Sequence, residues 1–251
     1  MSDVRPFATA DDVADAAVFL FVTLAAKAIA ERGVFFCSLA GGTTPLSSYR
    51  ILAAPLISSK VNWERTHVFW SDERCVPEGS RDRNDEAARD ALLGKVPIPS
   101  KNIHRVPATE PDAAQLYESD LRRAFSSSLP LKESSLSSSS EIPRFDLILL
   151  GMGPDGHTAS LFPSHPAVEE KTRLVVHVDG APKPPPARVT FTLPLINAAR
   201  HVAFLVTGVD KNAALRRVLN GDQALPAARV APRDGTLVFL SDAAALTGEA
   251  R

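Results

Sequence analysis

The sequence predicts a single α/β domain in which helices cover both faces of a mostly parallel β-sheet. Apolar, β-branched runs alternate with helical patterns along the 251 residues, and this alternation is typical of α/β folds. Two of the runs, Val34–Ala40 and Leu147–Leu150, are apolar almost throughout instead of alternating with polar residues. Strands that are buried on both faces have this pattern, and burial of both faces favours parallel pairing between layers of helices.

Composition places the chain among globular proteins. Apolar residues make up 45% and charged residues 23%, close to the soluble average, which excludes a disordered chain, a coiled coil and a collagen. Lys and Arg number 28 against 29 Asp and Glu, so the basic excess of a nucleic-acid-binding protein is missing. Two cysteines, Cys37 and Cys75, form neither a disulfide framework nor a zinc pattern, and we expect both to be reduced thiols.

The first predicted helix spans Ala10–Glu31. Thr9 can cap it, Asp12 stands where a capping box needs an acid, and Gly33 follows its end. The uncharged run Ala16–Ala26 is shorter than the ~20 residues that a bilayer requires. The acidic segment before this run has the wrong sign for a signal peptide. We therefore expect a cytoplasmic protein that does not contact a membrane.

The other elements follow in alternation along the chain. The predicted strands are Val34–Ala40, His67–Ser71, Phe145–Leu150, Leu174–Val178, Arg188–Leu193, His201–Thr207 and Thr236–Ser241. The predicted helices are Pro45–Ala53, Asn84–Leu93, Pro111–Ala124 and Lys211–Leu219.

One segment breaks the alternation. Residues 126–141 hold nine serines and few apolar side chains, so they cannot bury enough surface to order themselves. We interpret this segment as a flexible surface loop within one domain. A linker between two domains is the alternative, but strand-like segments continue on both sides without a change in composition.

Three unusual clusters each follow a predicted strand. They are Gly41-Gly42-Thr43-Thr44-Pro45, Ser71-Asp72-Glu73-Arg74, and the glycine-rich stretch from Gly151 to Thr158. The carboxyl ends of parallel strands form the ligand crevice of an open α/β sheet. The three clusters are therefore expected to converge on one site.

The first cluster has the features of a phosphate cradle. Gly41 and Gly42 allow close approach of the backbone, Thr43 and Thr44 add hydroxyls, and Pro45 suits a first helical turn. The N–H groups at the start of the following helix would bind an anion. An ordinary strand-to-helix turn is the alternative interpretation, and the Lys of a Walker loop is missing.

The second cluster offers an acid and a base at a strand end. Asp72 could accept a hydrogen bond from a substrate hydroxyl, and Arg74 could bind an anion or stabilise an oxyanion. A surface ion pair is the alternative.

The third cluster contains the candidate base. Gly151-Met152-Gly153-Pro154-Asp155-Gly156 fits G-x-G-x-x-G, but the prolines that follow and a late acidic residue disfavour dinucleotide binding. Asp155 stands two residues before His157, where a carboxylate can orient the imidazole and keep it basic. Arg188 and Lys211 could add the positive charge that a phosphate ester needs, although each alone is an ordinary solvated cation.

Together these motifs resemble the glucosamine-6-phosphate isomerase/6-phosphogluconolactonase family. The resemblance rests on the Gly-Gly-Thr-Thr-Pro turn, on Trp70-Ser71-Asp72-Glu73-Arg74, on Gly151–Pro163 and on Pro184–Thr192. The motifs occur in the family's order from about Ala8 to Leu246. The resemblance implies a Rossmann-like three-layer fold shared with the glucosamine-6-phosphate deaminases.

The resemblance also implies a function. A lactonase of this family hydrolyses 6-phospho-D-glucono-1,5-lactone in the oxidative pentose phosphate pathway, with neither a metal nor an organic cofactor. His157, Asp155, Asp72 and Arg74 are then the catalytic candidates. The substrate and phosphate candidates are Gly41, Gly42, Thr43, Thr44, Arg188 and Lys211. We expect a small sugar-phosphate lactone as the binding partner, no nucleic acid, and a monomer or weak homodimer.

Two other functions fit the same fold. The sister deaminase has, by resemblance, a glutamate five residues beyond the histidine of Asp-Gly-His, and that position here is Phe162. A sugar-phosphate-binding regulator without catalysis would keep the phosphate turn and lose the base, yet Asp155 and His157 are both present.

Overall fold

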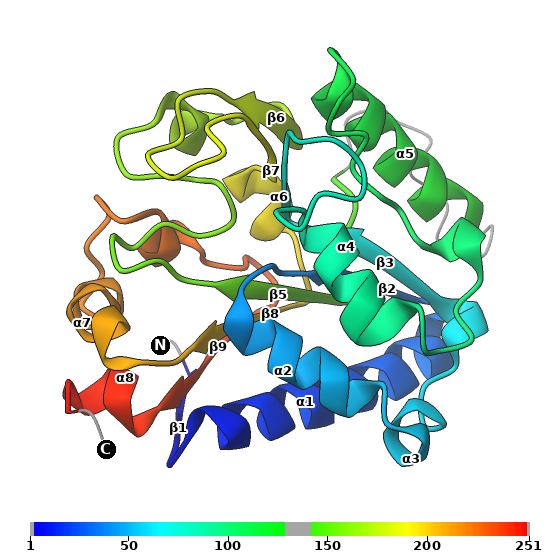
Figure 1. Ribbon diagram of the computed structural model, residues 1–251, viewed down its shortest axis with the longest axis horizontal. Helices are drawn as coiled ribbons and strands as arrows, with labels where there is room; N and C mark the ends of the chain where they lie inside the picture. Colours follow the sequence, from blue (N-terminus) through cyan, green and yellow to red (C-terminus); the bar gives the residue numbers. More distant parts are fainter. Residues whose placement is uncertain (1–2, 129–141, 250–251) are drawn as a thin grey trace.

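The computed structural model describes residues 3–128 and 142–249, and its centre is a six-stranded sheet (Figure 1). The strands of this sheet all pair in parallel. In spatial order they are β1 (Asp3–Phe7), β9 (Thr236–Asp242), β8 (His201–Val206), β5 (Leu147–Gly151), β2 (Phe35–Leu39) and β3 (Thr66–Trp70). This arrangement confirms the predicted α/β fold class.

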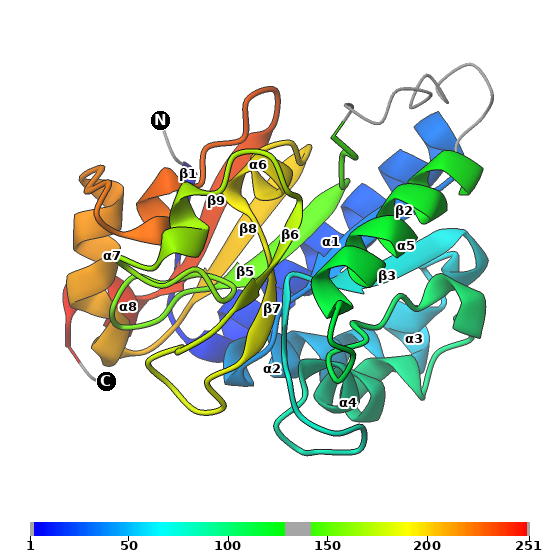
Figure 2. The ribbon, with the colours of Figure 1, turned by 90° about the horizontal axis from the view of Figure 1, so that it is seen from above.

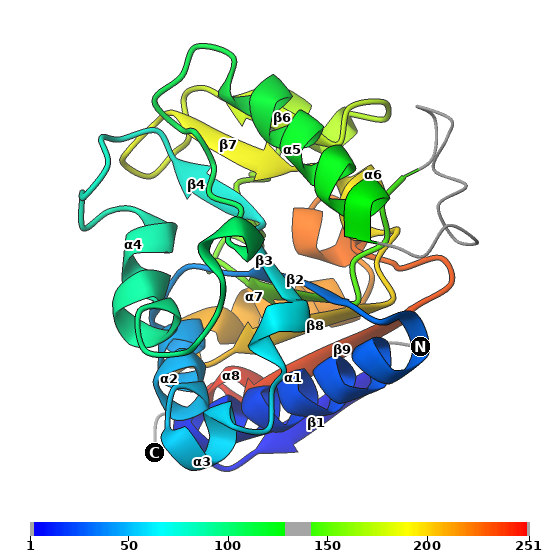
Figure 3. The same cartoon turned by 90° about the vertical axis from the view of Figure 1, so that its right-hand side faces the viewer.

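Helices lie on both sides of the sheet, and β2 shows why. Its neighbours Phe35 and Phe36 point to opposite faces. Phe35 packs edge-on against Phe21 of α1 (Ala10–Arg32), and Phe36 stacks on Phe125 of α5 (Ala113–Ser128) at 3.8 Å. In Figure 3, α1 and α2 (Thr43–Leu52) lie on one side of the sheet and α5 on the other.

The predicted ends of α1 are confirmed. Thr9 and Asp12 form a capping box, and Gly33 ends the helix in the left-handed conformation. By length and composition alone, α1 is apolar enough to cross a membrane. Its side chains Val13, Ala17 and Phe21 are buried in the core of the protein.

The shorter helices connect the strands. They are α3 (Pro55–Ser58), α4 (Asn84–Ala88), which continues as a π-helical turn over Arg89–Leu93, α6 (Leu193–Ile196), α7 (Asn212–Leu219) and α8 (Ala243–Thr247). Seen from above, α7 and α8 lie beside each other near the end of β9 (Figure 2).

Two strands predicted by sequence belong to a second sheet, which corrects their placement. β6 (Val175–Val178) and β7 (Arg188–Phe191) pair antiparallel with each other, and β4 (Asp72–Arg74) completes this sheet on the other edge of β7. The second cluster is therefore a short strand and not a loop. β4 pairs with a strand more than 110 residues away, and such a non-local pairing leaves no local sequence signal.

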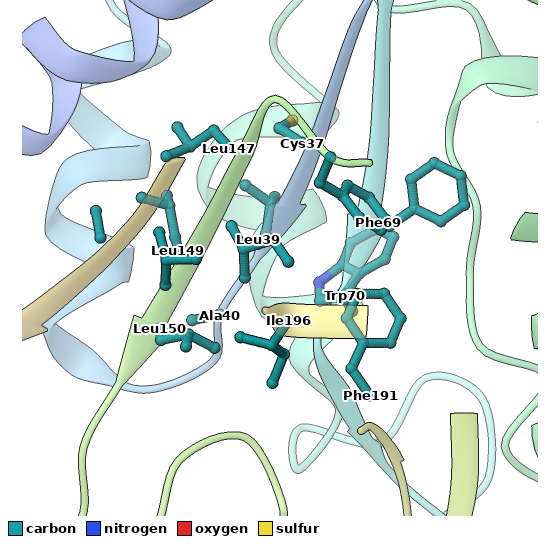
Figure 4. Close-up of a cluster of buried hydrophobic side chains, with 14 of the residues drawn as sticks. Cys37, Leu39, Ala40, Phe69, Trp70, Leu147, Leu149, Leu150, Phe191 and Ile196 are labelled. Atoms are coloured by element: carbon teal, nitrogen blue, oxygen red, sulfur yellow. The ribbon is translucent and has the colours of Figure 1, made fainter. Parts of the chain in front are cut away.

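The two sheets share one core (Figure 4). Leu39 of β2, Phe69 and Trp70 of β3 and Leu150 of β5 are at most 1% exposed, as is Phe191 of β7. In Figure 4 the side chains of Phe191 and Ile196 lie against those of β2, β3 and β5. This packing fixes the second sheet over the carboxyl half of the first.

One strand was not predicted, and one helix end differs from its prediction by more than two residues. Strand β1 was not predicted, because Asp3–Phe7 is a largely exposed edge strand with few apolar residues. Helix α5 extends to Ser128, so the predicted loop over 126–141 begins inside a helix. The rest of that loop, from residue 129, lies outside the described residues.

The strand order changes direction between β2 and β5. From β2 the chain goes to β3 on one side, whereas β5, β8 and β9 build outward on the other side. A crevice forms at the carboxyl ends of the strands at such a switch point. Gly41 follows β2 and Gly151 ends β5, so two of the predicted clusters flank this crevice.

Candidate active site

A cavity of about 330 Å³ opens at the switch point. Nine of the ten predicted site residues line it: Gly41, Gly42, Thr43, Thr44, Asp72, Arg74, His157, Arg188 and Lys211. The tenth, Asp155, contacts His157 from outside the lining. The structure therefore brings together all three clusters and both later cations.

Asp155 and His157 form a hydrogen-bonded pair at the end of β5. Oδ1 of Asp155 lies 2.5 Å from Nδ1 of His157, so Nε2 is the nitrogen left for a reaction. A Cβ atom at Gly153 would lie 2.1 Å from the His157 ring and 2.4 Å from Oδ1 of Asp155. Only glycine fits at position 153 while this pair keeps its geometry.

The surroundings keep His157 neutral and Asp155 ionised. Burial lowers the pKa of His157 below its ordinary value of 6.5, although the hydrogen bond and the charge of Asp155 act in the opposite direction. Burial also opposes ionisation of Asp155, but the hydrogen bond and charge of His157 outweigh it and lower the pKa of Asp155. At neutral pH the imidazole is therefore an unprotonated base oriented by a carboxylate.

Asp72 lies in a buried polar network at the same cavity. Its Oδ2 accepts a hydrogen bond of 2.6 Å from the Ser160 hydroxyl and lies 3.9 Å from Nη1 of Arg188. The side-chain amide of Asn84 donates to the Asp72 carbonyl at 2.9 Å and to Oδ1 at 3.3 Å. The carboxylate is held in one orientation from several sides.

Arg188 holds a loop as well as charge. Its Nε donates to the Pro185 carbonyl at 2.7 Å, and Nη2 donates to the carbonyls of Lys183 and Pro184. Burial, and then the nearby charge of Arg74, lower the pKa of Arg188 below its ordinary value. Arg188 thereby fixes the loop that brings Lys183 to the cavity.

The glycine turn begins α2 at the other wall. Gly42 has a φ of 99°, a conformation that L side chains rarely adopt, and it precedes the first helical residue, Thr43. The first N–H groups of a helix have no partner within it. The Thr44 hydroxyl lies 2.7 Å from that of Thr207 after β8, and Lys211 lines the same cavity beside its ion-pair partner Asp210.

Sequence reasoning missed several lining residues. They are Asn84, Lys183 and Thr207 in the lining, with Ser160 behind Asp72. Ser160 lies within the motif already quoted, and Lys183 directly precedes Pro184, so position could have drawn attention to these two. Asn84 carries no local signal, because it begins a helix and reaches the site only through folding.

Within residues 3–128 and 142–249, no three His, Cys, Asp or Glu side chains gather in a way that could hold a metal ion. The absence of a cofactor stays a prediction.

A family model described as glucosamine-6-phosphate isomerases/6-phosphogluconolactonase matches residues 8–239. The chain belongs to this family. Among its relatives is a 6-phosphogluconolactonase of Mycobacterium tuberculosis, 40% identical over 97% of this chain and 98% of the relative. A probable chloroplastic 6-phosphogluconolactonase 4 of Oryza sativa subsp. japonica is 39% identical over 98% of this chain and 76% of the relative.

Solved structures of the family have the same fold. The 6-phosphogluconolactonase of Thermotoga maritima aligns with a TM-score of 0.80 at 33% identity, covering 96% of this chain and 100% of that one. The one from Trypanosoma brucei aligns with a TM-score of 0.82 at 27% identity over 100% and 99%. A monomeric glucosamine-6-phosphate deaminase aligns with a TM-score of 0.74 at 18% identity, which shows a shared fold alone.

Phe162 faces the base. Its ring centroid lies 4.7 Å from that of His157, at the position where the resemblance led us to expect a glutamate in a deaminase. An apolar ring at this position supplies no acid or base to a substrate.

Proposed function

We propose that this chain hydrolyses 6-phospho-D-glucono-1,5-lactone to 6-phospho-D-gluconate, a step of the oxidative pentose phosphate pathway. The observation that carries the proposal is the Asp155–His157 pair, which faces a cavity lined by Arg74, Lys183 and Lys211. The lactone has an electrophilic carbonyl and a dianionic phosphate, so it needs a base at one end and positive charge at the other. The relatives named as 6-phosphogluconolactonases support the same activity.

In the proposed reaction His157 acts as a general base. Its Nε2 takes a proton from water while the water oxygen attacks the lactone carbonyl carbon. Asp155 orients the ring and stabilises the imidazolium that forms. The carbonyl oxygen becomes an oxyanion, which Arg74 or backbone N–H groups stabilise. The bond between the carbonyl carbon and the ring oxygen then breaks, and the ring oxygen takes up a proton to become a hydroxyl group.

The phosphate binds remotely from the reacting carbonyl in this proposal. The turn of Gly42, Thr43 and Thr44 offers backbone N–H groups and hydroxyls, and Arg188 and Lys211 supply charge. The nearby Asp72 is placed to accept hydrogen bonds from sugar hydroxyls. Fixing the phosphate holds the carbonyl near His157, which lowers the entropic part of the barrier.

Lactone hydrolysis by the wild type and by His157→Ala tests the proposal. The lactone is generated fresh in the assay, and its spontaneous hydrolysis is subtracted. We expect acceleration by the wild type and its loss in the variant. If the wild type gives no acceleration but turns over glucosamine 6-phosphate, the chain is a deaminase. Binding of 6-phosphogluconate without any turnover would indicate a regulator.

Location and assembly are part of the same proposal. We expect a cytoplasmic enzyme that is a monomer or weak homodimer. Rice relatives carry the word chloroplastic in their names, so family membership does not decide the compartment. Sedimentation at several concentrations measures the assembly state.

A further inference from the structure

Glu73 is a buried carboxylate that the proposed reaction does not use. It lies between Asp72 and Arg74 in β4 and is 0% exposed. Successive side chains of a strand point to opposite faces. Asp72 and Arg74 therefore face the cavity, and Glu73 points away from it into the protein.

The Glu73 carboxylate accepts three backbone hydrogen bonds. Oε1 accepts from the N–H of Arg74 and of Asn84, both at 2.8 Å, and Oε2 accepts from the N–H of Asp85 at 2.9 Å. Asn84 and Asp85 are the first two residues of α4. The carboxylate thus joins the start of this helix to the strand that carries Asp72 and Arg74.

Asn84 transmits this anchor to the cavity. Its side-chain amide donates to Asp72 and lines the cavity itself. A Cβ atom at Gly41 would lie 1.9 Å from the Asn84 amide oxygen, so this side chain also lies directly against the glycine turn. Asn84 therefore contacts both Asp72 and the turn at Gly41, and Glu73 binds the backbone of Asn84.

The charges around Glu73 hold the helix start, and Arg83 and Arg188 act on Glu73 only from a distance. Asp85 pairs with Arg83 at 2.6 Å and with Arg105 at 2.8 Å. Across the described residues, no ion pair to Glu73 is formed. Burial, and then the charge of Asp85, raise the pKa of Glu73 toward neutrality against its three N–H donors. The other titratable groups near it are Arg74, Cys75, Tyr117 and Arg188.

We propose that Glu73 is a positioning residue of the active site, which acts through Asn84 to hold Asp72 and the turn at Gly41 in the geometry that the substrate requires. This inference rests on the proposed lactonase function. It explains why a strand with two cavity-facing charges carries a third, buried acid between them.

Glu73→Gln tests the proposal, because glutamine keeps the shape and one acceptor oxygen but loses the charge. We expect kcat/KM for the lactone to fall about tenfold, since small displacements of positioned groups are costly. Glu118→Gln is the matched control. Glu118 also accepts backbone N–H groups, those of Leu174 and Val175, but lies outside the cavity lining. It should change thermal stability without changing kcat/KM.

A double-mutant cycle separates positioning from general stabilisation. If Glu73 acts through Asn84, the variant carrying both Glu73→Gln and Asn84→Ala should be no less active than Asn84→Ala alone. Multiplying losses, or wild-type kcat/KM in a folded Glu73→Gln variant, would overturn the proposal. In either case a wild type active on the lactone leaves the proposed function intact.

The pH dependence decides the matter if Glu73→Gln fails to fold. The wild-type profile of kcat/KM should then contain a second ionisation besides that of His157, and Asn84→Ala should lack it. The same two ionisations in both proteins would overturn the proposal.

Discussion

Three histidine–carboxylate pairs lie in the described residues, and one of them, His177–Asp179, is exposed at the surface. Of the two less exposed pairs, only one has the surroundings of a catalytic site. At the cavity, Asp155 contacts His157. At the other end of the sheet, Oδ2 of Asp120 lies 2.8 Å from Nδ1 of His104, whose Nε2 lies 3.0 Å from Nδ1 of His67. The hydrogen-bonded row of Asp120, His104 and His67 borders a second cavity of about 790 Å³, here called the far cavity, which is also lined by Arg65 and Lys101.

The difference lies in what surrounds each pair. His67 belongs to the start of β3, at the amino ends of the strands, where no glycine turn or switch point converges. His104 stacks on Phe69 at 4.1 Å, and His67 lies 5.0 Å from Phe36. The far pair is therefore part of an aromatic core. A large cavity and a histidine–carboxylate pair do not identify an active site, whereas convergence of strand ends, a helix start and cations does.

Replacing His157 or His104 should give the largest difference in kcat between the two regions. His157→Ala should lower kcat by about 10²–10⁴-fold, the usual contribution of a general base, with little change in KM. His104→Ala should leave kcat unchanged and lower the melting temperature, because it removes a stacked ring and leaves Asp120 without this partner. Near-normal turnover by His157→Ala, or a comparable loss in His104→Ala, would contradict this comparison.

Gly153→Ala should damage the catalytic pair without removing either member. The added Cβ would lie 2.1 Å from the His157 ring, so the ring has to move. Misplacement of a reacting group by about 1 Å can cost about 10²-fold, and we expect a loss of that size in kcat. Gly94→Ala is the control, since its Cβ meets only Arg89, outside the cavity lining. A Gly153→Ala variant with wild-type kcat would show that the observed pair is not needed.

Much of this site could be predicted from the local sequence. The glycines, Thr43, Thr44, Asp155 and His157 lie in contiguous stretches after apolar strands, where local pattern and strand-end geometry suffice. The second sheet could not be predicted, because Asp72 and Arg188 meet through a pairing of distant strands. Asn84 was missed because it begins a helix and reaches the site only through folding, whereas Lys183 directly precedes a quoted motif and could have been found.

Removing one lysine from each cavity, Lys211 or Lys101, compares the roles of their cations. Lys211→Ala should raise KM for the phosphorylated lactone about tenfold, because one charged contact to phosphate is lost. The KM for a lactone without phosphate should hardly change. Lys101→Ala, at the far cavity, should alter neither value. Equal losses by Lys211→Ala on both substrates would argue against a phosphate role.

Acid should destabilise the fold through His67, the histidine that contacts the far pair. Burial, and then the charge of His104, lower the pKa of His67 from 6.5 to about 4. The folded protein therefore favours neutral His67, so this contribution to stability is complete above pH 6.5 and is lost as the pH falls toward 4. The full shift corresponds to roughly 3 kcal/mol, and because His67 is only partly buried, solvent screening makes the actual loss smaller. Melting temperatures of the wild type and His67→Gln, measured from pH 7 to pH 4, check this. The melting temperature of the variant should fall less with acid than that of the wild type. An equal fall would show that the folded protein does not favour neutral His67. Because His67 lies outside the catalytic cavity, His67→Gln should keep wild-type kcat at pH 7. That result would assign a structural role to His67 and leave catalysis to His157.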